Sequence, residues 1–392
     1  MRVVFIPDVP EYGGAYNSFC EMVETLAENH SVEPIILTAK NGKYLEFAQS
    51  KGYESYVINY KPFYLQKGNT IEIRLVKFLL LPYLYCRYVL VGYMAIKSIE
   101  RVIDFNCIDI IHSNVNRDDI GAILSGRHGV PHVWHLREPS EKNRYYSFRH
   151  NFISFMNQNT DAFIAISDMV KSEWEKSGIE GEKIHRVYNG IDVKRFYANR
   201  TNDVGNIIRI IMIGRLAVHK GQIILLRAIA MLPKEYREQI HVDFYGNSEM
   251  GYKRRLERYI KHEGIEEAIS FCAYDTSIEK ALSRYDVGMM CSNNEGFGRA
   301  TIEYMLSGLC VIASNSGANP ELVDDGVSGF LFKNNDAADL ARVITNICNN
   351  KRQIRTIGKL AQQIAAKRFS REQNANSVYE LYENLINEKR KL

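Results

Sequence analysis

The sequence has few features that would cross-link the chain or bind a metal ion. Its 392 residues include seven cysteines, an odd number, and these are scattered along the chain. No Cys-x-x-Cys pair and no His/Cys cluster with the spacing of metal ligands occurs. These absences argue against a disulfide-stabilised secreted scaffold and a structural zinc site, and they predict reduced thiols in a cytoplasmic protein.

Two motifs that would direct an α/β chain to other chemistry are also missing. No Gly-x-Gly-x-x-Gly follows the first predicted strand, residues 3–6, which argues against a dinucleotide-dependent oxidoreductase. No Asp-x-Asp pair stands at the end of a predicted strand. We therefore expect neither a metal ion nor another cofactor.

A strong net charge and an unbroken apolar run are absent as well. The 50 Lys and Arg against 46 Asp and Glu leave a net charge of +4, too small to predict a nucleic-acid partner. The apolar stretch of membrane length, 78–96, is interrupted by Pro82, Arg87 and Gly92. Because an arginine at the centre of a spanning helix costs at least about 2.5 kcal/mol, we expect no spanning helix, and the N-terminus is too short for a signal peptide.

Short apolar segments rich in β-branched residues alternate with longer amphipathic segments along the whole chain. This alternation predicts parallel sheets with helices on both faces, the α/β class. A chain of 392 residues exceeds what one core usually organises, so we expect two domains. The predicted strands are residues 3–6, 32–38, 56–60, 108–112, 132–136, 163–166 and 186–188, followed by 207–213, 241–245, 269–273, 287–292 and 311–313.

The most informative segment follows the strand 287–292. Glu295 lies in a glycine-rich loop, and we expect Glu303 about two turns into the next helix. The backbone amides available at the start of that helix belong to Gly296, Phe297 and Gly298. Carboxylates accept hydrogen bonds from sugar hydroxyls, and amides at a helix start donate to phosphate or hydroxyl oxygens. The segment therefore predicts a site for a polyhydroxylated anion, although two glutamates at this spacing also occur on ordinary solvated helices.

With its flanking segments, this motif resembles the signature of the retaining glycosyltransferases of family four, the glycogen-synthase-like group with the GT-B fold. Further matching segments are 310–314, 317–331, Asn189-Gly190-Ile191-Asp192, Gly214-Arg215-Leu216 with Lys220-Gly221, and Gly13-Gly14. The resemblance implies two Rossmann-like, doubly wound domains that face each other across a cleft. It makes 1–191 an acceptor domain that a crossover helix in 371–392 completes, and 192–370 the nucleotide-sugar donor domain.

The resemblance also assigns roles at the donor site. Arg215 and Lys220 would hold the diphosphate, whose negative charge grows as the sugar leaves. Glu295 would bind hydroxyls of the donor sugar and Glu303 those of the ribose. Glu321 matches an acidic position near the nucleotide. Without the family match, an arginine and a lysine at a helix start would be ordinary surface residues.

Two further assignments rest on position alone. His135 ends the strand 132–136, where the family carries a histidine that reaches the donor sugar, but the usual aspartate after it is replaced here by Leu136. His112 is the rival, and a histidine at a strand end is often structural. Gly13 and Gly14 match a donor-site turn, although a double glycine is more often only a turn.

Residues 61–97 resemble the family least and mix basic with aromatic side chains. Such a mixture suits an interfacial helix on an anionic membrane surface. The alternatives are a buried helix pair whose cations form a rim, and a nucleic-acid surface that no recognised motif supports.

The sequence thus predicts a metal-independent, retaining glycosyltransferase that moves a sugar from a nucleotide diphosphate sugar, with UDP favoured, to a growing lipid-linked glycan in cell-surface polysaccharide biosynthesis. We expect it in the cytoplasm, peripheral on the inner face of the plasma membrane. Two alternatives stay open: a non-catalytic nucleotide-sugar-binding partner or regulator, and a nucleotide-sugar epimerase.

Overall fold

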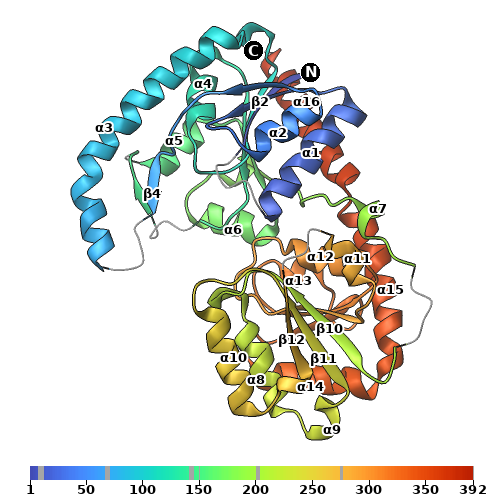
Figure 1. Ribbon diagram of the computed structural model, residues 1–392. Helices are drawn as coiled ribbons and strands as arrows, with labels where there is room; N and C mark the ends of the chain where they lie inside the picture. The colour runs from blue at the N-terminus through green and yellow to red at the C-terminus, as the bar shows by residue number, and fades with distance from the viewer. Residues whose placement is uncertain are drawn as a thin grey trace. The chain divides into compact units, whose positions relative to one another are not determined.

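The computed structural model describes residues 1–7, 13–66, 71–140, 145–149, 151–199, 204–273 and 277–391. The chain separates into two compact units (Figure 1). Unit 1 comprises Met1–Gly190 and Arg371–Leu392, and unit 2 comprises Ile191–Ser370. The division expected from the sequence fell after residues 191 and 370.

Unit 1 is built on a seven-stranded parallel sheet with the order β3-β2-β1-β5-β6-β8-β9. Its strands are β1 (Arg2–Ile6), β2 (Glu33–Thr38), β3 (Glu54–Val57), β5 (Ile110–Ser113), β6 (His132–Leu136), β8 (Ala162–Ala165) and β9 (Ile184–Arg186). The winding direction reverses between β1 and β5, because β2 and β3 lie on one side of β1 and the later strands on the other. In such sheets the carboxyl ends of the strands at the reversal are where ligands bind.

The helices of unit 1 include the last helix of the chain. They are α1 (Gly14–His30), α2 (Lys43–Ser50), α3 (Ile71–Val102), α4 (Ile120–His128), α5 (Phe152–Asn159), α6 (Asp168–Lys176) and α16 (Arg371–Lys389). The helix α16 packs against α1 (Figure 1). Its buried Val378 and Tyr382 join Val3 and Phe5 of β1 in one hydrophobic cluster, so the end of the chain completes the core of unit 1.

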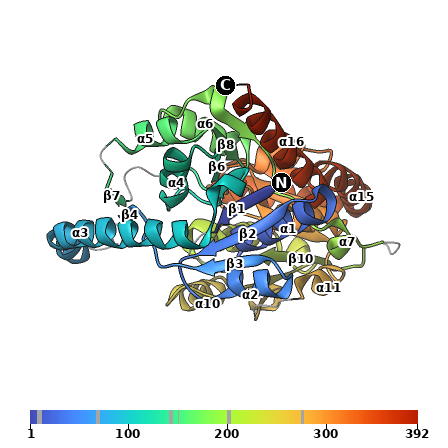
Figure 2. The same cartoon turned by 90° about the horizontal axis from the view of Figure 1, so that it is seen from above.

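The helix α3 is one long helix along the side of unit 1 (Figure 2). Pro82, Arg87 and Gly92, which interrupt the apolar run in the sequence, do not interrupt the helix. The alternative of a buried helix pair is also wrong. Within the described chain, 72–102 is the one helix long and apolar enough to cross a membrane, and only 6% of its most apolar stretch is buried. Pro82 is exposed within α3, and a proline inside a helix removes one backbone hydrogen bond without necessarily ending the helix.

Unit 2 is built on a six-stranded parallel sheet with the order β12-β11-β10-β13-β14-β15. Its strands are β10 (Ile208–Ile213), β11 (Ile240–Tyr245), β12 (Ile269–Cys272), β13 (Val287–Met290), β14 (Cys310–Ser314) and β15 (Gly329–Phe332). The reversal of winding lies between β10 and β13. Their carboxyl ends lead directly into the segments 214–220 and 291–298.

The longest helices of unit 2, α14 and α15, are the last two in the order of the chain. They are α7 (Val193–Phe196), α8 (Gln222–Met231), α9 (Lys234–Arg237), α10 (Tyr252–Glu263), α11 (Ile278–Leu282), α12 (Arg299–Leu306), α13 (Asn319–Leu322), α14 (Ala337–Asn349) and α15 (Lys351–Arg368). The core is formed by strand residues such as Ile210 and Ile312, packed against apolar side chains of α8 and α14.

Several strands differ from the predicted ones. A short antiparallel pair, β4 (Tyr64–Gln66) and β7 (Tyr145–Ser147), was not predicted. Neither was β15, which is only four residues long and begins with Gly329. The strand β9 lies two residues before its predicted position. Such short strands carry too little alternation to be recognised, and pairing within the sheet decides their bounds.

Candidate active site

An ion pair lies where the two central strands of unit 2 end. The 3₁₀ helix η4 (Val218–Lys220) brings Lys220 over the loop after β13, where its Nζ donates to Oε2 of Glu295 at 2.7 Å. The two side chains are 25% and 21% exposed. A lysine and a carboxylate that face each other but remain open to solvent can each turn toward a ligand.

Gly221 and Gly317 explain why this pair forms. Gly221 has φ +76°, and a Cβ there would lie 2.1 Å from the carbonyl oxygen of Cys291 at the end of β13. Gly317 has φ +59°, and a Cβ there would lie 2.6 Å from both the backbone nitrogen and oxygen of Glu295. Only glycine allows both the left-handed conformation and the close approach. The two glycines therefore allow the backbone segments that carry Lys220 and Glu295 to pack closely against their neighbours.

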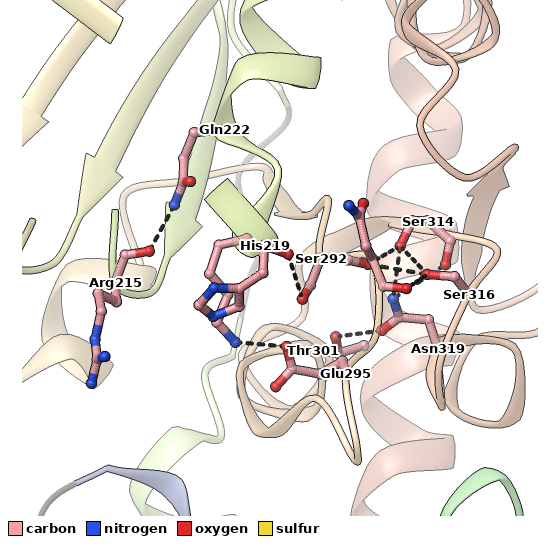
Figure 3. A network of polar contacts seen from close by, with 11 residues as sticks. Arg215, His219, Gln222, Ser292, Glu295, Thr301, Ser314, Ser316 and Asn319 are labelled. Atoms are coloured by element: carbon pink, nitrogen blue, oxygen red, sulfur yellow. Dashed lines mark hydrogen bonds and ion pairs between the residues drawn. The ribbon is translucent and has the colours of Figure 1, made fainter. Parts of the chain in front are cut away.

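A network of neutral hydrogen bonds fixes the same loop (Figure 3). Oγ of Ser314 donates to the carbonyl oxygen of Ser292 at 2.6 Å, and Oγ of Ser316 donates to that of Asn293 at 2.9 Å. Nδ2 of Asn319 donates to the carbonyl oxygen of Ser314 at 3.2 Å. The loop that carries Glu295 is thus tied to the end of β14 and the start of α13.

Glu303 is paired with Arg299 instead of lying free on a helix face. Nε of Arg299 donates to Oε1 of Glu303 at 2.9 Å, and the side chains are only 10% and 12% exposed. Glu303 is the fifth residue of α12, one turn from its start, so the expected depth of two turns is wrong. The helix begins after Gly298, whose φ of +76° requires glycine, and Phe297 before it is buried against Phe369.

Arg215 has a different acidic neighbour from that of Lys220, and Glu321 lies on the short helix α13 that follows the Glu295 loop contact. The side chain of Arg215 is 67% exposed, and its guanidinium lies 4.0 Å from Glu249. Figure 3 shows this guanidinium extending away from His219 and Glu295. The carbonyl oxygen of Arg215 accepts a hydrogen bond from Gln222, and the carbonyl oxygen of Glu321, on α13, accepts one from Arg368 at 2.9 Å. The two predicted diphosphate cations therefore have different carboxylate neighbours in this structure.

His219 belongs to the cluster although sequence reasoning missed it. Its carbonyl oxygen accepts from the backbone nitrogen of Asn293 at 3.2 Å and from Oγ of Ser292 at 3.3 Å. Burial, and then the charge of Lys220, lower the pKa of its imidazole. The spacing of one residue before Lys220 could have indicated it, because both end the same 3₁₀ turn.

A second polar cluster lies in unit 1 at the ends of β5 and β6. His135 is fully buried, and its Nδ1 lies 3.2 Å from Nε2 of His112. Nδ1 of His112 in turn lies 2.5 Å from the hydroxyl of Tyr382 on α16. The rival histidines of the sequence are therefore partners.

Arg137 is the buried cation of this cluster. Its Nε donates to Oδ1 of Asn114 at 2.8 Å, one terminal nitrogen donates to Oδ1 of Asn189 at 2.6 Å, and the other lies 3.5 Å from Nδ1 of His135. Burial, and then the charge of Arg137, hold the pKa of both His112 and His135 well below the usual range. Both imidazoles are therefore neutral at physiological pH.

Gly13 and Gly14 stand at the start of α1. Gly13 precedes the helix with φ +91°, which a residue with a side chain rarely adopts, and Gly14 is its first residue. A Cβ at Gly13 would meet nothing within 4 Å, so conformation and not crowding calls for glycine. Among the described residues, no group of three or more His, Cys, Asp or Glu could hold a metal ion. Metal independence stays a prediction.

Two family models match the two halves of this chain. The model described as Glycosyltransferase Family 4 matches residues 12–195. The model described as Glycosyl transferases group 1 matches residues 194–367. Their junction coincides with the linker between the two parallel sheets.

Curated relatives and solved structures point the same way. The chain is 25% identical to the uncharacterised glycosyltransferase MJ1178 of Methanocaldococcus jannaschii over 74% of its own length and 80% of the relative. It is 32% identical to the D-inositol 3-phosphate glycosyltransferase of Corynebacterium kroppenstedtii over 45% of its length and 40% of the relative. Anabaena HepE in complex with UDP superposes with a TM-score of 0.78 at 21% identity, covering 98% of this chain and 100% of HepE.

Proposed function

Because the chain belongs to the family 4 glycosyltransferases, we propose that it transfers a sugar from a nucleoside diphosphate sugar to a growing glycan with retention of configuration. Its membership of the glycosyltransferases, class EC 2.4, rests on the matches to both halves of the chain. The two parallel-sheet units have the GT-B fold. The donor, the stereochemistry and the acceptor are the subject of the proposal.

The Lys220–Glu295 pair carries the proposal. As the C1–O bond to the diphosphate breaks, negative charge grows on the leaving phosphate, and a preorganised ammonium stabilises that charge. Glu295 has acceptor lone pairs for the hydroxyls of the departing sugar. The 2.7 Å contact between Glu295 and Lys220 would keep the bound phosphate and the bound sugar next to each other.

The proposed reaction needs no protein nucleophile. The acceptor hydroxyl attacks C1 on the face that the diphosphate leaves, a new C1–O bond forms, and the acceptor proton passes to an oxygen of the departing phosphate. Glu303, buried beside Arg299, is proposed to accept a hydrogen bond from a ribose hydroxyl, because an ionised carboxylate is an acceptor with several lone pairs. Arg215 would have to turn from Glu249 to reach the phosphate.

UDP is the nucleotide we propose. HepE from Anabaena, which superposes on this chain, was solved with UDP and with UDP-glucose. The likeness at 21% identity is one of fold. It supports a uridine nucleotide as the first donor to test.

For the acceptor we propose a lipid-linked glycan, because α3 offers an apolar surface beside a basic one. The apolar and aromatic side chains exposed on α3 are Ile73, Leu75, Val76, Phe78, Leu79, Leu80, Tyr83, Tyr85, Val89, Leu90, Tyr93, Met94 and Val102. Its charged side chains are the basic Arg74, Lys77, Arg87, Lys97 and Arg101 and the acidic Glu72 and Glu100. Beside it lies a cavity of about 660 Å³ lined by aromatic rings and by Lys61.

We propose that α3 lies on an anionic membrane surface and does not span the membrane. The hydroxyl of Tyr88, in the middle of the helix, bonds to the buried carboxylate of Asp119. The last turns place Ala95 and Ile99 in the core of unit 1. These contacts hold the helix along the unit, while each basic residue near anionic lipid contributes roughly 1 kcal/mol. The corresponding location is the cytoplasm, at the inner face of the plasma membrane, in cell-surface polysaccharide assembly.

Transfer is tested on the purified chain with a panel of UDP-sugars and a polyprenyl-diphosphate-linked acceptor, with the anomeric configuration of the product read by NMR. We expect an α-linked product from an α-linked donor, and full rate in excess EDTA. Lys220→Ala should lower turnover about 100-fold. The matched control is Lys234→Ala, a surface lysine of the same unit whose nearest carboxylate is Glu238. An inverted product, or equal turnover in both variants, would refute the assignment.

Membrane association is tested by sedimentation with phosphatidylglycerol vesicles at low salt. Reversing Arg74 and Lys77 to Glu should abolish it while UDP still raises the melting temperature. Lys67, a third basic residue of this segment, lies outside the described residues. The control reverses Lys253 and Lys261 on α10 of unit 2. Wild-type protein that ignores the vesicles, or that resists extraction by high salt and alkaline carbonate, would contradict peripheral docking.

A further inference from the structure

Near the ends of β5 and β6, two buried hydrogen-bond donors have no acceptor among the described residues. Nε2 of His135 and Nδ2 of Asn114 are both buried, and neither has a hydrogen-bond partner within the part of the chain that the structure describes. Asn114 directly follows β5, and His135 lies near the end of β6, the strand that pairs with it. Since a buried polar group without a partner is costly, two such donors at neighbouring strand ends point to a ligand with oxygen acceptors.

Arg137 fixes which atom of each partner faces it. A guanidinium can only donate, so Asn114 must present its carbonyl oxygen to Nε of Arg137, 2.8 Å away. This leaves the NH₂ group of Asn114 as the free end. The same rule applies to Nδ1 of His135, 3.5 Å from the other end of the guanidinium, which must be the unprotonated nitrogen. The proton of neutral His135 therefore sits on Nε2.

The contacts that His112 and Tyr382 make lead to the same tautomer of His135. If Nδ1 of His135 is an acceptor, Nε2 of His112, at 3.2 Å, is its donor. Nδ1 of His112 is then unprotonated and accepts from the hydroxyl of Tyr382, at 2.5 Å. The reverse direction would turn an N–H of His135 toward Arg137 and leave the phenol proton of Tyr382 without an acceptor among the described residues. The hydroxyl of Tyr382 thus donates to His112, Nε2–H of His112 donates to His135, and Nε2–H of His135 is left to donate to a ligand.

We propose that Tyr382 and His112 are positioning residues that hold His135 as its Nε2–H tautomer, so that His135 and Asn114 donate to oxygens of the sugar substrate. The inference rests on the proposed sugar transfer for the identity of the ligand. It makes His135 a neutral hydrogen-bond donor and not a general base. The ligand oxygens belong either to a sugar hydroxyl or to a phosphate.

The groups that face the two imidazoles are known from the contacts. Arg137 and Tyr382 touch the pair, and His132 contributes electrostatically from the same strand as His135. Burial and these neighbours lower the pKa of His112 and His135. The tautomers should therefore be constant across the neutral pH range.

The tautomers are measured directly by ¹⁵N NMR of the full-length protein labelled at histidine, with His135→Gln used for assignment. We expect His135 and His112 to carry the proton on Nε2 and to keep it there between pH 5.5 and 8. A proton on Nδ1 of His135, or a charged imidazolium, would overturn the proposal. This measurement does not depend on any activity, so it separates failure of the relay from failure of the proposed function.

Addition of ligand identifies the acceptor oxygen. A shift of the His135 Nε2–H signal with UDP alone indicates a phosphate, and a shift only with a UDP-sugar indicates a hydroxyl. No shift with any nucleotide sugar that raises the melting temperature would show that the donor pair serves structure alone.

Tyr382→Phe tests the positioning role, since it removes the hydroxyl and keeps the ring. We expect turnover to fall about tenfold with little change in the donor KM, together with a mixture of His112 tautomers. The matched control is Thr25→Val, which removes a buried hydroxyl of the same unit that donates to the carbonyl oxygen of Glu21 at 2.7 Å. Equal kinetic loss in both variants would reduce Tyr382 to a packing residue.

Discussion

The two polar clusters differ in how the chain assembles them. In unit 2, Lys220, Glu295 and Glu303 come from the segments that follow the adjacent strands β10 and β13, and each belongs to an ion pair. In unit 1, the buried His112 and His135 are neutral, and a tyrosine 270 residues beyond His112 completes the chain of hydrogen bonds. The Lys220–Glu295 ion pair lies where solvent reaches it, whereas full burial beside the Arg137 cation favours the neutral forms of His112 and His135. A phosphate site and an oriented donor site thus use opposite environments.

We expect the largest effect on stability from removing one partner of the buried Arg299–Glu303 ion pair in unit 2. Glu303→Ala leaves the Arg299 cation without its partner, and breaking such a pair costs about 3–5 kcal/mol. We expect a lower melting temperature and a higher donor KM. Adding Arg299→Met should restore most of the stability without restoring the donor KM. A double variant that regains donor affinity would show that Glu303 only neutralises Arg299.

The exposed pair should respond in kinetics and not in stability. Glu295→Gln keeps the shape but removes the charge opposite Lys220, and we expect turnover at saturating donor to fall about 100-fold. Because both side chains are partly solvated, the free energy of unfolding should change by less than about 1 kcal/mol. Glu249→Gln, beside Arg215, is the control. Normal turnover of Glu295→Gln would remove Glu295 from the reacting centre.

Two glycines separate backbone strain from crowding in unit 2. Gly317→Ala adds a methyl group 2.6 Å from the backbone of Glu295, and Gly326→Ala meets nothing within 4 Å, although both positions have positive φ. We expect both to lose about 1 kcal/mol of unfolding free energy, and Gly317→Ala to lose turnover as well. Chemical denaturation and steady-state kinetics measure the two effects. Identical activity would show that the Glu295 loop tolerates displacement.

Mild acid should weaken unit 1 more than unit 2. The pKa of His132 falls to about 3 through burial, and those of His112 and His135 also lie below the unfolded value. The unfolded chain then binds more protons below about pH 6.5, so each histidine removes up to roughly 1.4 kcal/mol of stability per pH unit. Hydrogen exchange at pH 7 and 5.5 compares the units. Equal acceleration in both units would contradict neutral histidines in unit 1.

The fold class and the glycine-bounded segments could be predicted because their signals are local. Alternation of short apolar runs with amphipathic ones marks parallel sheets, and the last helix was predicted within 371–392, where α16 spans Arg371–Lys389. The depth of Glu303 was wrong by a turn, since α12 starts only after Gly298. The roles assigned by resemblance to Arg215, Lys220 and Glu321 stay predictions.

What could not be predicted depends on contacts distant in sequence. No spacing in the chain relates Tyr382 to His112, because only the docking of α16 on α1 joins them. The continuity of α3 was hidden for another reason. Its apolar residues lie all round the helix, so the usual sign of a helix with one face on a core is weak.

The return of α16 to unit 1 sets an order for synthesis on the ribosome. Residues 1–190 emerge first, yet Val378 and Tyr382 complete their core only after all of unit 2 has been made. At a synthesis rate of roughly 5–20 residues per second, the nascent first unit lacks these two core side chains for a time on the order of tens of seconds. Unit 2 is therefore the first part of the chain that can finish folding. The hydrogen bonds that join Tyr382, His112 and His135 can form only after α16 has been made.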